Sequence, residues 1–108
     1  MNFKPLINKL VRGTTKDMSE GKYTRPIVVC WYDITTFANA TPFDESIETH
    51  FQVDAGWPYL LYKNSVKGHV VRLMRSMPDP TKKYKKTDYE DCCDFIEIPI
   101  ETIWKVIV

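Results

Sequence analysis

The chain ends in two apolar, β-branched runs that are separated only by Pro99 and the three residues after it. The runs cover residues 92–98 and 103–108 and are rich in isoleucine. Because proline has no N–H to donate to a ladder, a strand should break or reach a sheet edge at Pro99. The pattern predicts two strands joined by a tight turn. Four isoleucines are the expected core residues of this pair: Ile96, Ile98, Ile103 and Ile107.

The length and composition indicate one domain with one core. The chain has 108 residues, of which 44% are hydrophobic and 13% aromatic, which suffices for one core but not for two. Cys30, Cys92 and Cys93 cannot form a closed disulfide framework. Together with His50 and His69, the cysteines show no zinc-binding spacing. We expect a single domain without a disulfide, a metal or a cofactor.

No segment is predicted to cross a membrane or to act as a signal peptide. The longest apolar run, residues 26–32, is far below the ~20 residues that a membrane helix needs. The lysines near the N-terminus are not followed by a continuous apolar stretch. We therefore expect a protein that is neither exported nor inserted in a membrane.

Residues 1–24 are predicted to form a short helix and a connector. Apolar side chains in residues 4–12 recur at helical spacing. Pro5 is acceptable in a first turn, and Gly13 suits the end of the helix.

A β-branched and aromatic run starting near Arg25 predicts the first long strand. The strand pattern then stops, and residues 34–55 are predicted to form a long insertion. Within it, "TPFDES" holds a threonine that can cap a helix, a proline for its first position and two acids that suit its N-terminus. A single short helix inside a long loop is expected.

Strand signals return in the middle of the chain. Residues 59–63 and 66–77 are predicted strands, with a tight turn at Asn64 and Ser65 between them. The apolar positions of the second strand change phase within residues 68–71. A bulge or a sharp bend there would reconcile the two phases.

Together these signals favour a mainly β fold with minor α content. We expect a five-stranded, strongly bent antiparallel small barrel. A short N-terminal helix precedes it, the long insertion follows its first strand, and a charged loop occupies residues 78–91.

Three segments, "VVCWYDI", "GWPYLLYKNSVKGHVVRLMRS" and "FIEIPIETIWKVIV", resemble a family of short, largely uncharacterised phage-encoded small-β-barrel proteins. The last segment is also similar to the final two strands of SH3-like and Sm-like barrels. The resemblance implies a small barrel and a phage accessory protein, located in the cytoplasm of an infected host cell. It supplies no catalytic residues. The insertion, the N-terminal helix and the Lys/Tyr-rich loop depart from the family pattern.

Charges alternate in sign along the chain although the net charge is only +1. Residues 63–86 hold eight Lys/Arg and one acid, and residues 87–108 hold six acids and one lysine. The plainer interpretation pairs a basic strand with an acidic strand beside it. The alternative is binding of RNA or single-stranded DNA by a mobile basic loop with one stacking tyrosine. The candidate nucleic-acid-binding residues are Lys67, Arg72, Arg75, Lys82, Lys83, Tyr84, Lys85 and Lys86.

Aromatic residues offer a second kind of contact surface. Trp31 and Tyr32 are neighbours in a predicted strand, so they point to opposite faces and cannot both enter the core. The exposed one either packs under the helix or the insertion, or marks a ligand or subunit contact. The candidate partner-binding residues are Trp31, Tyr32, Asp33, Phe43, Asp44, Glu45 and Trp57.

The sequence offers little for catalysis. A Cys–His pair would need His50 or His69 beside a cysteine, yet all three cysteines lie in apolar, strand-like settings. Asp33 with Asp44 or Glu45 could form a carboxylate pair, although loop and capping roles explain each of them.

We therefore expect a non-enzymatic binding protein that engages a host protein or a small ligand. Its contact surface would combine the insertion with the exposed aromatic residues. RNA or single-stranded DNA binding is the alternative, and a small hydrolase is the least favoured reading. Because the chain ends in an apolar strand with few charges, we also expect a homo-oligomer.

Overall fold

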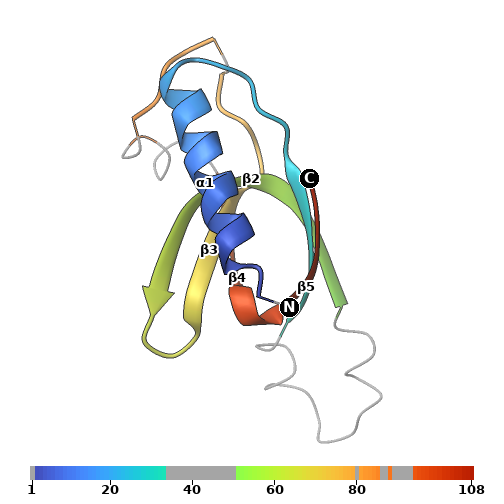
Figure 1. Ribbon diagram of the computed structural model, residues 1–108. Helices are drawn as coiled ribbons and strands as arrows, with labels where there is room; N and C mark the ends of the chain where they lie inside the picture. Colours follow the sequence, from blue (N-terminus) through green and yellow to red (C-terminus); the bar gives the residue numbers. More distant parts are fainter. Residues whose placement is uncertain (1, 34–50, 80, 86–87, 89–93) are drawn as a thin grey trace, which may run out of the picture.

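The structure is a computed structural model that describes residues 2–33, 51–79, 81–85, 88 and 94–108 (Figure 1). The helix predicted in "TPFDES", Cys92 and Cys93 lie outside these residues. A 3₁₀ turn, η3 (Ile100–Thr102), joins the last two strands. The elements follow in the order α1 (Lys4–Ser19), β1 (Ile27–Tyr32), β2 (Phe51–Asn64), β3 (Gly68–Met74), β4 (Phe95–Pro99) and β5 (Ile103–Ile107).

The strands form one antiparallel sheet with the order β4-β3-β2-β1-β5. Strand β2 belongs to both halves, because residues 51–56 pair with β1 and residues 57–64 pair with β3. The predicted mainly β fold, with five antiparallel strands and an N-terminal helix, is confirmed. Strands β4 and β5 are the two ends of this order, so the described hydrogen bonds leave the sheet open.

Gly56 lies where β2 passes from one partner strand to the other. A Cβ atom at this position would come within 2.4 Å of the carbonyl oxygen of Met74. Only glycine allows two backbones to approach so closely. The residue therefore permits the change of direction that lets β2 serve both halves of the sheet.

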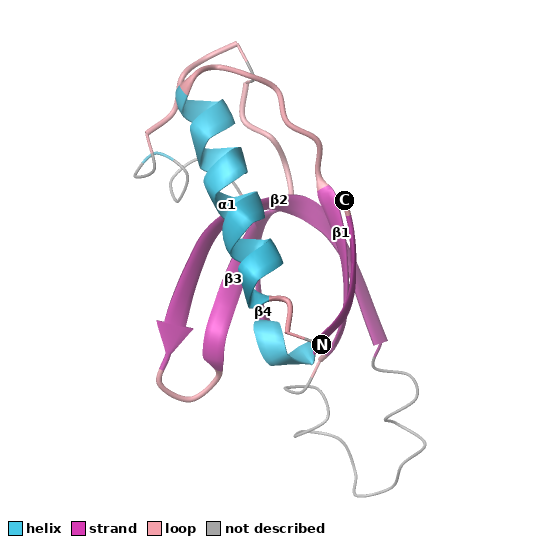
Figure 2. Cartoon of the chain, in the orientation of Figure 1, coloured by secondary structure: helices cyan, strands magenta, loops and turns pink. Residues whose placement is uncertain are grey.

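Helix α1 lies across the strands, as Figure 2 shows, and covers one side of the sheet. We call the residues buried between them the main core. Strands β3, β4 and β5 contribute Leu73, Ile98 and Ile103 to it. The prediction of Ile98 and Ile103 as core residues is confirmed, and Ile96 packs partly buried against this core. The main core consists of Phe3, Ile7, Val11, Ile27, Val29, Trp31, Val71, Leu73, Ile98, Ile100 and Ile103.

The prediction for Ile107 is wrong. Its side chain is 46% exposed, because Ile107 pairs with Val28 on the side of the sheet opposite to α1. The strand register between β1 and β5 shifts between Cys30 and Trp31. This shift changes which β5 residues point toward the helix, and the alternation of the sequence does not reveal it.

The predicted end of the helix at Gly13 is also wrong. Helix α1 continues to Ser19, and Thr14 and Met18 in its last turns are buried. Glycine lowers helix stability by about 1 kcal/mol relative to alanine, and burial of an apolar side chain can offset this. Packing of the helix C-terminal end therefore overrides the local signal.

The boundaries of the central strands differ from the prediction. Strand β2 already begins at Phe51, so residues 51–55 are strand and not part of an insertion. The bulge lies at Tyr59 on β2, where the register shifts between Pro58 and Leu60, and not within residues 68–71. Strand β3 is apolar in both phases because it is covered on both sides.

A second core explains that two-sided burial. It contains Met18 from α1 and Met74 from β3, whereas Leu73 beside Met74 belongs to the main core. Neighbouring strand residues thus point into different cores. The second core consists of Met18, Tyr59 and Met74, with Trp57, Leu60, Met77, Tyr84 and Phe95 packed against it.

Candidate binding surface

The two faces of β1 have different surroundings. Val29 and Trp31 point toward α1 and belong to the main core. Because side chains alternate along a strand, Val28, Cys30 and Tyr32 point to the opposite side. We call this side of β1, together with the flanking residues of β2 and β5, the outer face. It consists of Val28, Cys30, Tyr32, Phe51, Val53, Ala55, Trp104, Lys105 and Ile107.

Three aromatic rings from three different strands meet on the outer face. The Tyr32 ring centroid lies 4.9 Å from that of Phe51 and 6.4 Å from that of Trp104. The Phe51 and Trp104 rings are 6.3 Å apart in an edge-to-face arrangement. These are the spacings at which aromatic rings attract one another. We call this group the aromatic cluster.

The aromatic cluster is open to solvent. The exposed fractions of Tyr32, Phe51 and Trp104 are 37%, 48% and 47%. Val53 beside them is 66% exposed, and Ile107 extends the apolar surface along β5. These exposed parts add up to about 500 Å², near the upper end of what a monomeric protein leaves in one patch. Surfaces of this size and composition commonly bind a partner.

The polarity of β2 is inverted along the outer face. Register with β1 places Asp54 opposite Val29, on the inner side, while Val53 lies opposite Cys30, on the outer side. A sheet with one solvated face normally directs its polar residues outward. Here Gln52 and Asp54 are directed inward, whereas Phe51 and Val53 are directed outward. The outer face therefore presents apolar side chains where a solvated sheet face normally presents polar ones.

Of the predicted partner-binding residues that the structure describes, only Tyr32 belongs to the outer face. Trp31 is buried, and its Nε1–H donates a hydrogen bond to Asp54 Oδ2 over 2.8 Å. Trp57 is half-buried, and its Nε1–H donates to the Thr24 carbonyl oxygen over 2.8 Å. Both indole N–H groups therefore donate hydrogen bonds within the fold. Asp33 is half-buried at the end of β1, and Phe43, Asp44 and Glu45 lie outside the described residues.

Sequence reasoning missed Phe51, Val53 and Trp104. Phe51 and Val53 were assigned to the insertion, and Trp104 was considered only as part of the terminal strand. Phe51, Val53 and Ala55 alternate with polar residues, and this period-two spacing is a usable signal for a strand with an apolar outer side. The contact with Tyr32 depends on strand order and could not be inferred from spacing.

The predicted nucleic-acid-binding residues within the described part of the chain do not form one surface. Lys67 lies in the β2–β3 turn, where its backbone N–H donates to Asn64 Oδ1 over 3.0 Å. Residues 81–85 lie at the opposite end of the molecule, beside the C-terminal end of α1 (Figure 1). Arg72 and Arg75 belong to β3 and the segment directly after it. Lys86 lies outside the described residues.

Arg72 is engaged in contacts within the sheet. Its Nε lies 3.4 Å from Glu97 Oε2, and Glu97 is its register partner on β4. Its guanidinium carbon lies 4.7 Å from the centre of the Phe95 ring and 5.3 Å from that of Tyr62. The predicted pairing of a basic strand with an acidic strand is therefore confirmed at Arg72. The Tyr62 hydroxyl also donates a hydrogen bond to Glu97, which raises the pKa of Tyr62 together with burial.

The Lys/Tyr-rich segment is attached to α1. The Tyr84 backbone N–H donates to the Met18 carbonyl oxygen over 3.0 Å, and the Tyr84 ring packs against the second core. A Cβ atom at Gly21 would lie 3.4 Å from Lys83 Cγ. Acids accompany the lysines, because the Lys85 backbone N–H donates to Asp88 Oδ2 over 2.8 Å. Tyr84 is therefore a packing residue here.

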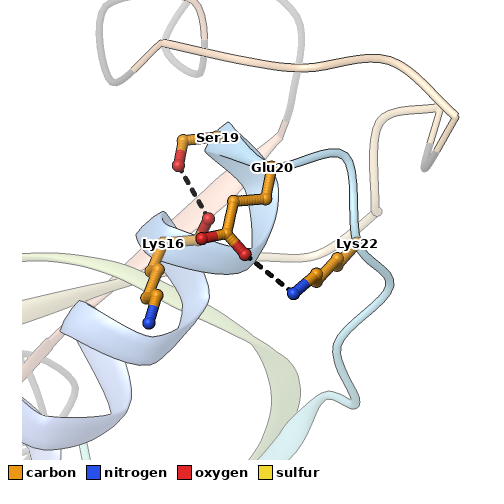
Figure 3. Close-up of polar contacts among 4 residues, drawn as sticks. All are labelled: Lys16, Ser19, Glu20 and Lys22. Atoms are coloured by element: carbon orange, nitrogen blue, oxygen red, sulfur yellow. Dashed lines mark hydrogen bonds and ion pairs between the residues drawn. The ribbon is translucent and has the colours of Figure 1, made fainter.

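Polar contacts join residues at and just after the C-terminal end of α1, as Figure 3 shows. Lys22 Nζ lies 3.0 Å from Glu20 Oε2, and this contact lowers the pKa of Glu20 and raises that of Lys22. The Ser19 hydroxyl donates to the Lys16 carbonyl oxygen over 2.7 Å. Lys22 lines the same small cavity as Lys82 and Tyr84. The sequence could not place Lys22 near them, because they are far apart along the chain.

The described residues do not bring Cys30 and His69 together as a Cys–His pair, nor do they assemble a metal-binding group. Cys30 is buried on β1 and His69 is half-buried on β3, and β2 separates the two strands. Among these residues, no group of three or more His, Cys, Asp or Glu side chains is placed to hold a metal ion. The remaining candidates lie outside the described part: His50, Cys92 and Cys93, and the carboxylates Asp44 and Glu45.

No protein-family model matches this sequence, and no curated protein or solved structure shows a significant match to it. No helix in the described part of the chain is long and apolar enough to span a lipid bilayer.

Proposed function

We propose that this protein is a non-enzymatic binding protein and that its outer face binds the surface of another protein molecule. The observation that carries this proposal is the exposure of the aromatic cluster, Tyr32, Phe51 and Trp104, on three adjacent strands. Aromatic residues are enriched in protein interfaces, where they provide most of the binding energy when they become fully buried.

The shape of the outer face favours a protein over a small ligand. A small molecule binds where a concave site can bury most of its surface. The outer face is instead the exposed side of three neighbouring strands, β2, β1 and β5. Such a surface can bury its aromatic side chains only against a partner of comparable extent.

RNA or single-stranded DNA binding has less support. A strand of phosphates requires a continuous basic surface, whereas Lys67, Arg72 and residues 81–85 lie in different places. Asp79 and Asp88 flank residues 81–85 and accept hydrogen bonds from the backbone N–H groups of Thr81 and Lys85. Arg72 is already paired with Glu97.

We also propose that the fold is a strongly bent small barrel of the SH3-like or Sm-like type. The strand order, the sharing of β2 by both halves and the short 3₁₀ turn between β4 and β5 support this reading. The sequence resemblance to phage-encoded small barrels favours a phage accessory role, with a host protein among the possible partners.

Affinity capture with matched variants tests the proposed function. The variant Trp104→Ser removes the largest ring of the aromatic cluster. The variant Tyr23→Ser removes a ring that is 63% exposed in the connector before β1 and serves as the control. We expect the wild type and Tyr23→Ser to retain the same protein, either a host protein or an untagged copy of this chain, after nuclease treatment and Trp104→Ser to lose it. Equal capture by all three proteins would refute the role of the outer face.

A further inference from the structure

We propose that the partner of the outer face is a second copy of this chain, so that two copies pack their outer faces together as a homodimer. The inference rests on the proposed function, because it names the partner of the same surface. It begins with the inverted polarity of β2. Directing Phe51 and Val53 outward is unfavourable in an isolated chain and favourable when the outer face is covered.

The near absence of charge on the outer face favours a second copy of the chain as its partner. Among the described residues that form it, Lys105 alone is charged. Interfaces between different proteins that associate reversibly are about as polar as the rest of the surface, whereas homodimer interfaces are more apolar. A face without acids and with one lysine offers no charge pattern for choosing an unlike protein.

Lys105 does not oppose this contact. It lies on β5, which is the last strand in the sheet order, and it is exposed. From an edge strand, the aliphatic part of a lysine can cover apolar neighbours while the ammonium group extends into water. The like charges of the two copies can therefore stay apart at the rim.

The size of the face predicts how tightly the dimer forms. Two copies that bury about 500 Å² each reach a total of about 1,000 Å², the lower limit of a specific interface. Face-to-face sheets pack about 10 Å apart with interdigitating side chains, which three rings and two aliphatic side chains can supply. We expect a dimer in exchange with the monomer, with a dissociation constant on the order of 10 µM.

Sedimentation velocity over about 1 to 500 µM tests this inference on three proteins. Val53→Lys places a charge in the middle of the outer face. Val66→Lys makes the same substitution at a valine that is 89% exposed in the β2–β3 turn, so both variants keep their buried residues and carry equal charge. We expect concentration-dependent dimers for the wild type and Val66→Lys. Val53→Lys should show at least tenfold weaker association.

Each other outcome overturns the homodimer. A wild type that stays monomeric at all concentrations would overturn the homodimer. If iodide also fails to quench Trp104 fluorescence in that monomer, another segment of the same chain covers the outer face. Dimers that Val53→Lys and Val66→Lys form equally well would place self-association elsewhere. A monomeric wild type that captures a partner lost in Trp104→Ser would overturn the homodimer and leave the proposed function intact.

Salt dependence gives an independent readout of the same interface. Exposed charge pairs weaken as ionic strength rises, whereas burial of apolar surface does not. Between about 0.05 and 1 M sodium chloride, the Debye length falls from about 14 Å to about 3 Å. The dimer should persist, or become tighter, over this range. A dimer that dissociates at high salt would exclude the outer face as its contact.

Discussion

Trp31 and Asp54 are joined by a 2.8 Å hydrogen bond on the inner side of the sheet, across strands β1 and β2. The two residues lie diagonally, because Trp31 is opposite Gln52 in the register and Asp54 is two residues further along β2. The Trp31 ring is buried, so its N–H depends on this acceptor. The bond explains why an acid is directed inward while its neighbours Val53 and Ala55 face out.

Removal of the Asp54 acceptor should destabilise the fold. Asp54→Ala leaves the buried Trp31 N–H without its partner, which typically costs about 1–3 kcal/mol in the free energy of unfolding. Asp54→Asn keeps a side-chain oxygen in place and should cost less than half as much. Urea unfolding monitored by circular dichroism measures both variants. Equal free energies of unfolding for Asp54→Ala and Asp54→Asn would show that the hydrogen bond to Trp31 does not stabilise the fold.

Two glycine-to-alanine substitutions should have opposite effects on stability. At Gly56 the new Cβ would lie 2.4 Å from the Met74 carbonyl oxygen, so β2 and β3 must separate, at a cost of about 2–4 kcal/mol. At Gly13 nothing lies within 4 Å of the new Cβ, and the helix should gain about 0.5–1 kcal/mol. Thermal unfolding of both variants checks the prediction. Destabilisation by Gly13→Ala would mean that α1 is not helical at that point.

The helix end shows how far local sequence signals reach. The apolar spacing predicted α1 correctly at its start, where Pro5 occupies the first turn. Gly13 then gave a stop signal that packing overrides, because Met18 is needed in the second core. Nothing in residues near Gly13 announces a contact with Met74, which is distant along the chain.

The strands were predictable where their burial follows the usual alternation. The runs that became β1, β3, β4 and β5 carry β-branched residues bounded by proline, glycine or acids. The first half of β2 was missed because its apolar residues, including Phe51 and Val53, face away from the core. The aromatic cluster was missed for the same reason, since joining Phe51 to Trp104 requires the strand order and the register.

Stability at alkaline pH should depend on Tyr62. Its hydrogen bond to Glu97 raises the pKa of Tyr62 above its ordinary value of 10.0. The bond therefore contributes its full stabilisation below about pH 10, and that contribution is lost as the pH rises through the higher folded-state pKa. Tyr62→Phe should unfold more easily than the wild type at pH 8, and the difference should shrink above pH 10. Unfolding midpoints in urea between pH 8 and 11.5 measure it; a difference that stays constant across this range would contradict it.

Two isoleucines that look equivalent in sequence should differ sharply in their contribution to stability. Ile98 is 0% exposed in the main core, whereas Ile107 is 46% exposed on the outer face. Ile98→Ala should lower the free energy of unfolding by about 2–5 kcal/mol, through lost burial and the cavity left behind. Ile107→Ala should lower it by less than about 1 kcal/mol when measured at 1 µM, where the monomer prevails. The same variant should weaken self-association at 100 µM, because it removes apolar area from the proposed interface. Denaturant unfolding at both concentrations separates the two roles, and an Ile107→Ala effect as large as that of Ile98→Ala at 1 µM would place Ile107 in the core after all.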